Sequence, residues 1–494
     1  MRIIGNNPAA DNAEITAVAS GTLPNGKPVI VNADGTVTVV QLVTETLSQA
    51  LGTNVNINAN YNGYWHSSAF DSQNNKVVVA YQDSNTNYGM AVVGTVNSEN
   101  STTISFGTPV VFKSAACTQM SVTFDSNRNR IAIFYTRSAD GYGITGSVSG
   151  TTISFAAESS SFWSASTVAN ISSCFVTDQN NIFVAFSKAA DSGGYIVATI
   201  ASNGTISYAG LSQFNGNTGQ ISVVYDTFRD RVILAFRDTA NSSYGTIFVC
   251  TVSGTTVSRS SNKYVFNSGA TEDVSLTFDS TAQKVVIFYT EYTPADKLFS
   301  KIGTTGTGSG GSESISFGSE VLVGDYYALN TDCTFDSNSS KVVVAFRDQG
   351  NASAQLLVGS VSGTSISFGT AVEFNNSAIQ GPSIAFDSNT KTCVLAFGIN
   401  SPSKNVGRVF RNASSYTVAN LTAENFIGIS TGGTYASGST ATVKIIGNTS
   451  NEQSSLTAGQ AYYVQTDGTI GTTAADPSVF AGTAISATRL IVKT

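Results

Sequence analysis

Charged side chains are scarce in this chain, and histidine is almost absent. Asp, Glu, Lys and Arg together make up 12% of the 494 residues, and the net charge is −7. Nucleic-acid phosphates require a basic surface, so this balance argues against a nucleic-acid partner. His66 is the single histidine, which nearly excludes imidazole metal clusters and Ser-His or Cys-His catalysis. We therefore expect no cofactor and no metal.

Paired cysteines, long apolar runs and a secretory leader are also missing. The five cysteines show no CxxC spacing, which indicates buried small side chains rather than disulfides or metal ligands. No apolar run is long enough for a membrane span, so no membrane insertion is expected. The first residues, MRIIGNNPAADNAEITAVASG, lack the apolar core of a signal peptide. A β-rich protein of this kind is either exported by another route or released by lysis.

What the chain does contain is an internal repeat. Residues 335–348 read FDSNSSKVVVAFRD, which is an aromatic strand end, a polar turn and a strongly β-forming apolar run. Copies of GSVSGTTISF add a second hairpin with Gly at its turn, so each repeat carries four strands. The anchor residue of the phrase recurs about every fifty residues, at Phe70, Phe124, Val176, Tyr225, Phe278, Phe335 and Phe386.

Seven such repeats predict an all-β protein built on a seven-bladed β-propeller. An open β-solenoid is the alternative, although its coils are usually shorter. Before the repeats, residues 28–40 read as a β-hairpin around Asp34-Gly35, and residues 43–51 could form one or two helical turns. After them, short strands indicate a small sandwich-like or barrel-like β domain. The expected division is 1–60 as an N-terminal attachment segment, 61–420 as the propeller and 421–494 as the C-terminal domain.

The seventh repeat departs from the pattern because it has no copy of the second hairpin. Its fourth strand is either residues 416–419 or a segment that precedes Tyr64. The second alternative would join both ends of the repeat region and lock the ring.

Three stretches of the chain resemble modules of phage tail and fibre proteins, especially those of marine phages. They are SGTLPNGKPVIVNADGTVTVV near the N-terminus, KVVVAFRD with VGSVSGTSISFGTAVEF in the repeats, and LTAGQAYYVQTDGTIGTTAADPSVFAGTAISATRLIVK near the C-terminus. The resemblance implies a virion protein of the tail, made in the host cytoplasm and released by lysis. It implies other tail proteins and a host-surface glycan or protein as partners, and we expect a homo-oligomer. It brings no family site residues with it.

The Asp of the repeated turn is interpreted as structural. Asp and Ser at a turn start accept hydrogen bonds from backbone amides through their side-chain oxygens. Equivalent positions around a ring also cannot converge on one substrate. The positions are Asp71, Asp125, Asp226, Asp279, Asp336 and Asp387.

The residues that follow each apolar run vary between repeats, and we expect them on the rim that also carries the connections between blades. Variable loops on a rigid scaffold often carry function. Arg can bind carboxylates or phosphates and Asp can bind sugar hydroxyls, but both could instead form salt bridges between blades. Aromatic residues in the connections could stack on sugars or wedge between blades. The candidate ligand-binding residues are Trp65, Asp83, Arg137, Trp163, Arg237, Asp238, Tyr326, Arg347 and Asp348.

An enzymatic function finds little support in the sequence. The Ser-x-Asp-x-Gly-x-Thr-Trp boxes of propeller sialidases are absent, and no carboxylate pair stands out for glycoside hydrolysis. We therefore expect a protein that is not an enzyme and that attaches to the host surface through the propeller rim. The alternatives are a purely structural tail, nozzle, collar or decoration component and, last, a polysaccharide-degrading enzyme.

Overall fold

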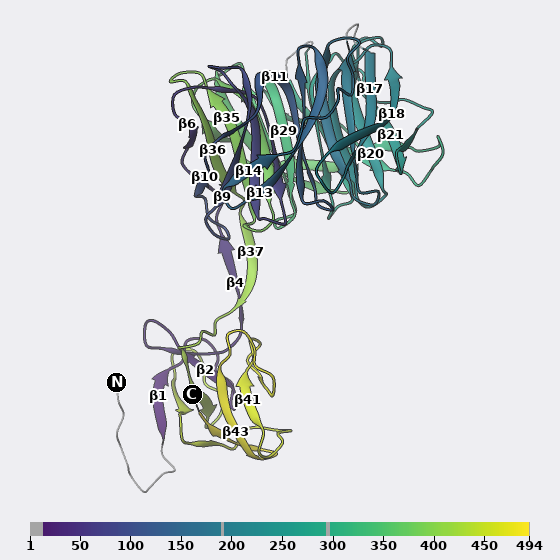
Figure 1. The fold of residues 1–494 in the computed structure, drawn as a ribbon. Coiled ribbons are helices and arrows are strands. Elements are labelled where there is room, and N and C mark those ends of the chain that lie inside the picture. The colour runs from purple at the N-terminus through teal and green to yellow at the C-terminus, as the bar shows by residue number, and fades with distance from the viewer. Residues whose placement is uncertain (1–12, 189–191, 293–296, 494) are drawn as a thin grey trace. The chain divides into compact units, whose positions relative to one another are not determined.

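The computed structural model of the chain describes residues 13–188, 192–292 and 297–493 (Figure 1). The regular elements in these ranges are β-strands, numbered β1 to β44. No helix that could cross a bilayer occurs among the described residues. The strands form two compact units, of which unit 1 comprises Met1–Leu47 and Ser414–Thr494 and unit 2 comprises Ser48–Ala413.

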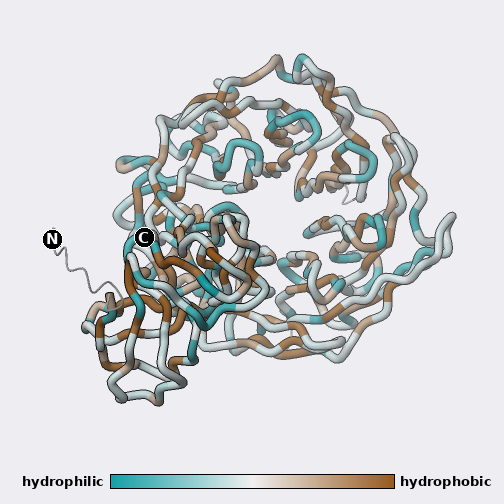
Figure 2. The backbone as a smooth tube through the Cα atoms, turned by 90° about the horizontal axis from the view of Figure 1, so that it is seen from below, coloured by the Kyte–Doolittle hydropathy of each residue, from teal (hydrophilic) through white to brown (hydrophobic). Residues whose placement is uncertain are grey.

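Unit 2 is a ring of antiparallel sheets, the blades, as Figure 2 shows. Each innermost strand packs beside the next one, and the last returns to the first. The described residues supply seven innermost strands: β7 (Gly63–Asp71), β11 (Val110–Asp125), β15 (Val168–Val176), β19 (Gly219–Asp226), β24 (Thr271–Asp279), β29 (Ala328–Asp336) and β34 (Ile379–Asp387). The predicted all-β propeller is confirmed.

Each innermost strand pairs with a second strand, and the second strand with a third. The second strands are β8 (Lys76–Asp83), β12 (Arg130–Arg137), β16 (Asn181–Lys188), β20 (Arg231–Asp238), β25 (Lys284–Glu291), β30 (Lys341–Asp348) and β35 (Thr392–Ile399). The third strands are β9 (Tyr88–Val96), β13 (Asp140–Ser149), β17 (Ser192–Ile200), β21 (Tyr244–Ser253), β26 (Lys297–Thr305), β31 (Ser353–Ser362) and β36 (Lys404–Arg411).

Short outer strands complete most blades. They are β10 (Ile104–Phe106), β14 (Thr152–Phe155), β18 (Ile206–Asn215), β22 (Thr256–Arg259), β23 (Tyr264–Asn267), β27 (Ile315–Phe317), β28 (Val321–Gly324), β32 (Ser365–Phe368) and β33 (Val372–Asn375). β11 serves two blades, because its first part pairs with β9 and its second part with β12.

The apolar runs are buried because both faces of every second strand meet a neighbouring blade. In β30, Val342 and Val344 pack into one core cluster, whereas Val343 and Ala345 pack into another. All four are fully buried. Burial of each Val side chain contributes about 1.5–3 kcal/mol, so the cores between blades hold the ring together.

The repeated Asp residues form turns, as predicted. Asp336 Oδ1 accepts hydrogen bonds from Asn338 N (2.9 Å) and Ser339 N (3.1 Å). The other five aspartates accept the same pair of backbone bonds. We call the end of unit 2 that carries these turns the turn rim. The opposite end, where the second strand of each blade leads into the third, is called the bulge rim.

The anchor of the third repeat is Phe175 rather than Val176. Val176 pairs with Asn181 as Asp336 pairs with Lys341, so Val176 occupies the Asp position. The expected alignment placed Thr177 of TDQNN at the Asp position, but strand pairing fixes the register one residue earlier.

The seventh blade is closed by residues that precede Tyr64. β36 pairs with β5 (Ala50–Leu51) and β6 (Val55–Asn58). This is the second alternative that the sequence left open. The helical turns considered for residues 43–51 are wrong, because β4 (Leu42–Leu47) pairs instead with β37 (Ser414–Ala419).

Unit 1 consists of two sheets that share a core. One sheet runs β1 (Glu14–Val18), β39 (Thr440–Lys444), β38 (Phe426–Thr431), β2 (Pro28–Val31) and β3 (Val37–Val39). The other runs β40 (Thr449–Ser450), β44 (Arg489–Val492), β43 (Phe480–Ser486), β41 (Ala461–Val464) and β42 (Ile470–Gly471). The core includes Ile30, Phe426, Tyr462 and Leu490.

The predicted hairpin of residues 28–40 is present as β2 and β3. It pairs with β38, so the N-terminal segment and the C-terminal domain form one unit rather than two. The expected boundary at residue 60 therefore falls differently in the structure. Residues up to 47 belong to unit 1, and residues from 48 belong to the propeller.

Candidate ligand site at the propeller channel

Every innermost strand of unit 2 contains a β-bulge at the same place. The pairing with the second strand shifts register there in all seven described blades. At each bulge one residue has a positive φ, which for residues other than Gly costs about 1–2 kcal/mol. Strain of this kind is concentrated at functional sites. These bulge positions are Trp65, Gln119, Asn170, Gln220, Asp273, Asn330 and Gly381.

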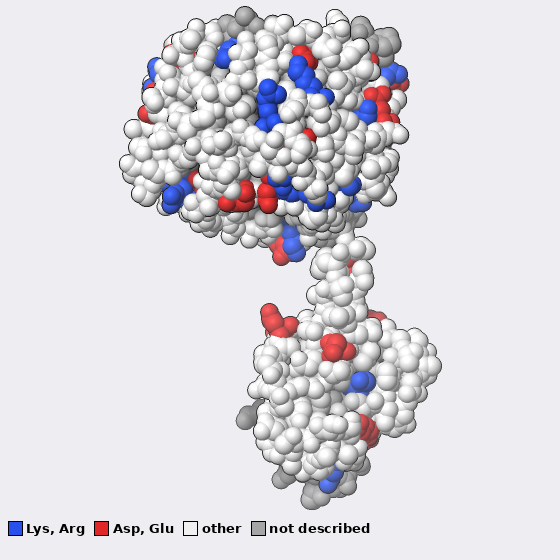
Figure 3. All heavy atoms as spheres, turned by 90° about the vertical axis from the view of Figure 1, so that its right-hand side faces the viewer, with Lys and Arg blue, Asp and Glu red and all other residues white. Residues whose placement is uncertain are grey.

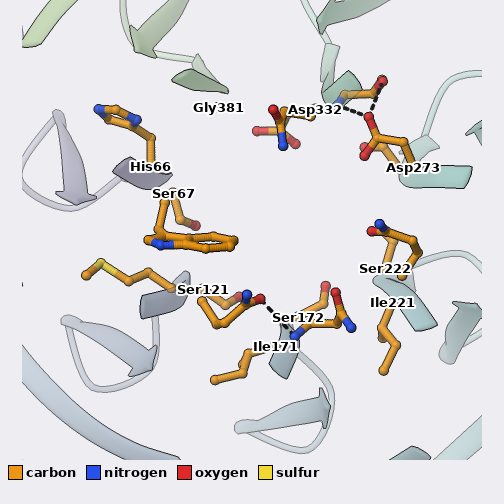
Figure 4. A pocket seen from close by; sticks show the side chains of 18 of the residues that line it. His66, Ser67, Ser121, Ile171, Ser172, Ile221, Ser222, Asp273, Asp332 and Gly381 are labelled. Carbon is orange, nitrogen blue, oxygen red and sulfur yellow. Dashed lines mark hydrogen bonds between the residues drawn. The ribbon is translucent and has the colours of Figure 1, made fainter. Parts of the chain in front are cut away.

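The bulges line a cavity of about 390 Å³ on the axis of unit 2. All seven innermost strands contribute to its wall, which Figure 4 shows from close by. Its surface is mostly Ser, Gln, Asn and Asp, together with Trp65, whose side chain is 43% exposed. The cavity therefore combines hydrogen-bonding groups with an accessible aromatic ring.

A belt of side-chain hydrogen bonds joins neighbouring innermost strands beside the bulges. Ser67 Oγ accepts a hydrogen bond from Val122 N (2.9 Å), and Ser172 Oγ accepts one from Val223 N (3.0 Å). Equivalent contacts, at 2.7–3.2 Å, span the remaining blade junctions. Each bond contributes about 0.5–1.5 kcal/mol, and together they fix the spacing of the cavity wall.

Two carboxylates, Asp273 and Asp332, lie on adjacent strands of the cavity wall. Asp273 Oδ2 accepts hydrogen bonds from Thr331 N (2.7 Å) and Thr331 Oγ1 (3.1 Å). Burial raises the pKa of Asp273 to about 7, and the negative charges of Glu272 and Asp332 add to this rise. Asp273 Oδ1 has no hydrogen-bond partner among the described residues, so it is available to a ligand.

Asp332 is more fully engaged than Asp273. Its Oδ1 accepts a hydrogen bond from Cys333 N and its Oδ2 one from Ile384 N, both at 2.9 Å. Burial raises the pKa of Asp332 to about 6. Asp332 thus links two blades while adding negative charge to the cavity.

His66 contributes a neutral imidazole to the opposite wall. Its Nε2 lies 2.9 Å from Asn405 Oδ1, and its ring stacks on Tyr81 with 6.0 Å between centroids. Burial lowers the pKa of His66 to about 4. Within the described ranges, no group of three His, Cys, Asp or Glu residues is arranged to hold a metal ion.

The three predicted aspartate ligands are buried and engaged by the protein itself. Asp83 Oδ1 accepts hydrogen bonds from Asn85 N (3.0 Å) and Thr86 N (2.9 Å). Asp238 pairs with Lys263 at 2.7 Å. Asp348 accepts hydrogen bonds from Gly350 N (3.1 Å) and Asn351 Nδ2 (2.6 Å). Their carboxylates therefore order the loops of the bulge rim.

The three predicted arginines do not form one site. Arg137 lies over the Tyr142 ring, 4.1 Å from its centroid, and pairs with Glu158 at 3.3 Å. Strand pairing makes Arg137 the equivalent of Asp238, whereas Arg237 and Arg347 occupy the preceding position of their blades. None of the three lines the channel cavity, as far as the described residues go. On the face of unit 2 seen in Figure 3, charges are scattered singly or in small mixed groups.

Of the predicted aromatic residues, Trp65 alone lies on the channel cavity in the described part of the chain. Trp163 donates a hydrogen bond from Nε1 to Ser166 Oγ (3.0 Å), and Lys188 lies 4.2 Å from the centre of its ring. Tyr326 packs on Phe346 with 5.2 Å between centroids. The structure thus brings only one of the nine predicted residues to the cavity.

The remaining bulge positions were not singled out in the sequence. A signal was present. The residue four places before the Asp position of each turn is Ser in six of the seven blades, whereas the residue two places before that Ser is Trp, Gln, Asn, Asp or Gly. The nearly constant positions are Ser67, Ser121, Ser172, Ser222, Ser275, Asp332 and Ser383.

Comparison with known proteins supports the fold of unit 2. No protein-family model and no curated protein sequence matches the chain. The BP39L lectin from Burkholderia pseudomallei has a similar structure, with a TM-score of 0.50, 7% identity, and coverage of 71% of this chain and 99% of the lectin. The periplasmic gluconolactonase PpgL from Pseudomonas aeruginosa gives a TM-score of 0.45 and 11% identity, covering 72% of this chain and 98% of that chain. At such identities the similarity concerns the fold alone.

Proposed function

We propose that unit 2 binds a carbohydrate in the channel cavity. The observation that carries this proposal is Trp65, an exposed indole held at a positive φ (56°) on the wall of a polar cavity. An aromatic face packs against the apolar side of a sugar ring, while amide, hydroxyl and carboxylate groups exchange hydrogen bonds with its hydroxyls. A fold shared with a lectin agrees with this use of the scaffold.

The wall of the cavity is suited to such a ligand because it is organised in advance. The belt from Ser67 to Ser383 ties the innermost strands together, so little ordering is required when a ligand binds. The bulge positions present Gln119, Asn170 and Gln220 next to one another on adjacent strands. Side-chain amides provide both donors and acceptors, as recognition of hydroxyl groups requires.

The protein is further proposed to be a component of a phage tail that contacts a glycan on the host surface. This part rests on the sequence resemblance to phage tail and fibre modules. Its expected partners are other tail proteins, further copies of the chain and the host-surface glycan. A purely structural tail component is the competing function, and it requires no ligand in the channel.

A glycan array probed with the purified full chain tests carbohydrate binding. The wild type should retain a defined set of glycans, and Trp65→Ala should weaken binding of that set by roughly 30-fold, since a central aromatic anchor contributes about 2 kcal/mol or more. Tyr326→Ala is the matched control, because Tyr326 packs on Phe346 away from the cavity. A blank array for the wild type, or equal losses in both variants, would contradict the proposal.

A further inference from the structure

The channel cavity is lined by two acidic side chains, which carry negative charge above their raised pKa values of about 7 and about 6. Asp273 and Asp332 line it, and no Lys or Arg among the described residues does so. In Figure 4 the two aspartates lie side by side, across the cavity from His66 and Ser67. We propose that the sugar bound in this cavity carries a free ammonium group, as an unsubstituted amino sugar does. This inference rests on the proposed function and specifies its ligand.

Asp273 is the residue that receives the ammonium group. Its Oδ2 is fixed by Thr331 N and Thr331 Oγ1, which leaves the unpartnered Oδ1 oriented by those bonds. An ammonium donor at Oδ1 forms a charge-assisted hydrogen bond, which is roughly twice as strong as a neutral one. It also offsets the desolvation that a ligand imposes on this carboxylate.

Other sugar classes fit the charge of the cavity less well. A uronic or sialic acid would bring a further carboxylate beside Asp273 and Asp332, with no lining cation to compensate it. A neutral N-acetylated sugar can stack on Trp65, but it supplies no positive charge opposite the Asp273 carboxyl, which is ionised above about pH 7. A cation is compatible with the indole as well, because the face of Trp attracts positive charge.

Gly381 provides the space that such a ligand occupies. It is the one bulge position without a side chain, and it lies on β34, beside the β7 strand that carries Trp65. A Cβ at Gly381 would meet no atom within 4 Å, so a larger residue would project into open space. Asn170 and Asn330 hold the equivalent positions of other blades at positive φ (49° and 53°), so Asn is tolerated there.

Titration calorimetry with matched oligosaccharides tests the inference. The probes are β-1,4-linked glucosamine oligomers, N-acetylglucosamine oligomers of the same length, and oligouronates. The wild-type full chain should bind the glucosamine oligomer roughly tenfold or more tightly than the acetylated one, as expected for one charged hydrogen bond, and should not bind the oligouronate. Asp273→Asn should remove this preference while binding of the acetylated oligomer stays within about twofold.

Two further variants make the result specific. Asp325→Asn removes a side chain that is 76% exposed and is not part of the cavity lining, so the preference should persist. Gly381→Asn should abolish binding of both hexosamine oligomers. If Asp273→Asn does not fold, the wild-type preference must still weaken with added salt.

The failures of the two proposals can be told apart. Equal or tighter binding of the acetylated or uronate probe, or a preference that survives Asp273→Asn, overturns the ammonium inference and leaves carbohydrate binding intact. If the chain binds other glycans of the array but neither hexosamine oligomer, the ammonium inference is likewise overturned and carbohydrate binding remains intact. A wild-type chain that binds no glycan at all overturns the proposed function itself.

Discussion

Two places with positive φ recur in all seven described repeats of the propeller, one in the turn and one at the bulge, and they differ in what surrounds them. In the turn, Ser340 (φ 54°) follows Asp336, whose side chain accepts hydrogen bonds from two turn amides. At the bulge, Asn330 (φ 53°) lies on the channel cavity. The same conformation is thus part of a scaffold in one place and part of a cavity wall in the other.

Within one repeat, the turn position is nearly constant and supports the scaffold, whereas the bulge position varies and lines the cavity. The turn keeps its Asp in six of seven repeats, because that carboxylate satisfies amides that burial would otherwise leave unpaired. The bulge accepts Trp, Gln, Asn, Asp and Gly, because its geometry is imposed by the pairing and the belt beside it rather than by the residue. A position that is strained and free to vary is suited to recognition.

The largest effect on stability is expected when the Asp of a turn is replaced. Asp336→Ala removes hydrogen bonds to Asn338 N, Ser339 N and Asn412 Nδ2 (2.6 Å) from a residue that is 1% exposed. The free energy of unfolding should fall by about 2–4 kcal/mol, since buried donors are left unpaired. Urea denaturation measures it.

Asp387→Ala is the matched control for this prediction. Asp387 accepts the same two backbone bonds, but in the described part of the chain it accepts neither of the side-chain bonds that Asp336 accepts from Asn412 and from Ser339 Oγ (2.7 Å). The decrease in the free energy of unfolding should be smaller for Asp387→Ala than for Asp336→Ala by about 1 kcal/mol. Neither variant should alter the order of preference among bound glycans. A change in that preference would mean that the turns belong to the recognition surface.

Much of the fold was predictable because it rests on local signals that repeat. The apolar runs, the Asp turns and the Gly turns each specify a strand or hairpin within a few residues, and seven copies made the propeller evident. The sequence left two closures of the seventh blade open and could not choose between them, because Leu51 pairs with Phe410 across most of the chain. The pairing of the N-terminal hairpin with β38, which joins distant segments into unit 1, was not predictable.

The cavity was harder to predict than the fold. Gly and Asn are the residue types that usually indicate a positive φ in a sequence. Trp65, Gln119 and Gln220 have positive φ although their residue types do not predict it. The charged residues of the rim loops were more conspicuous, but Asp83, Asp238 and Asp348 proved to be buried in loop contacts. Sequence shows which residue types could bind a ligand, and only packing shows which of them face a cavity.

A weaker effect is expected from the charge of the bulge at Asp273. Because its pKa is raised from 3.8 to about 7, the folded protein binds more protons than the unfolded chain between these values. Stability should therefore fall as pH rises from about 4 to about 7, with about 4 kcal/mol as the upper limit for this group. Asp273→Asn should flatten part of this slope in thermal melts at a series of pH values. Asp332, whose pKa burial raises to about 6, adds to this slope.

The smallest effect is expected when the backbone strain of positive φ is relieved, once at the bulge and once in the turn. Asn330→Gly and Ser340→Gly both remove a Cβ from a residue at positive φ, so each should raise stability by at most about 1 kcal/mol. Ser340 loses a contact with Thr281 Oγ1 (3.1 Å), which makes its gain the smaller one. Asn330 lines the cavity, so its replacement should also change glycan affinity, whereas Ser340→Gly should not. Equal affinities for both variants would show that the bulge at Asn330 serves the scaffold only.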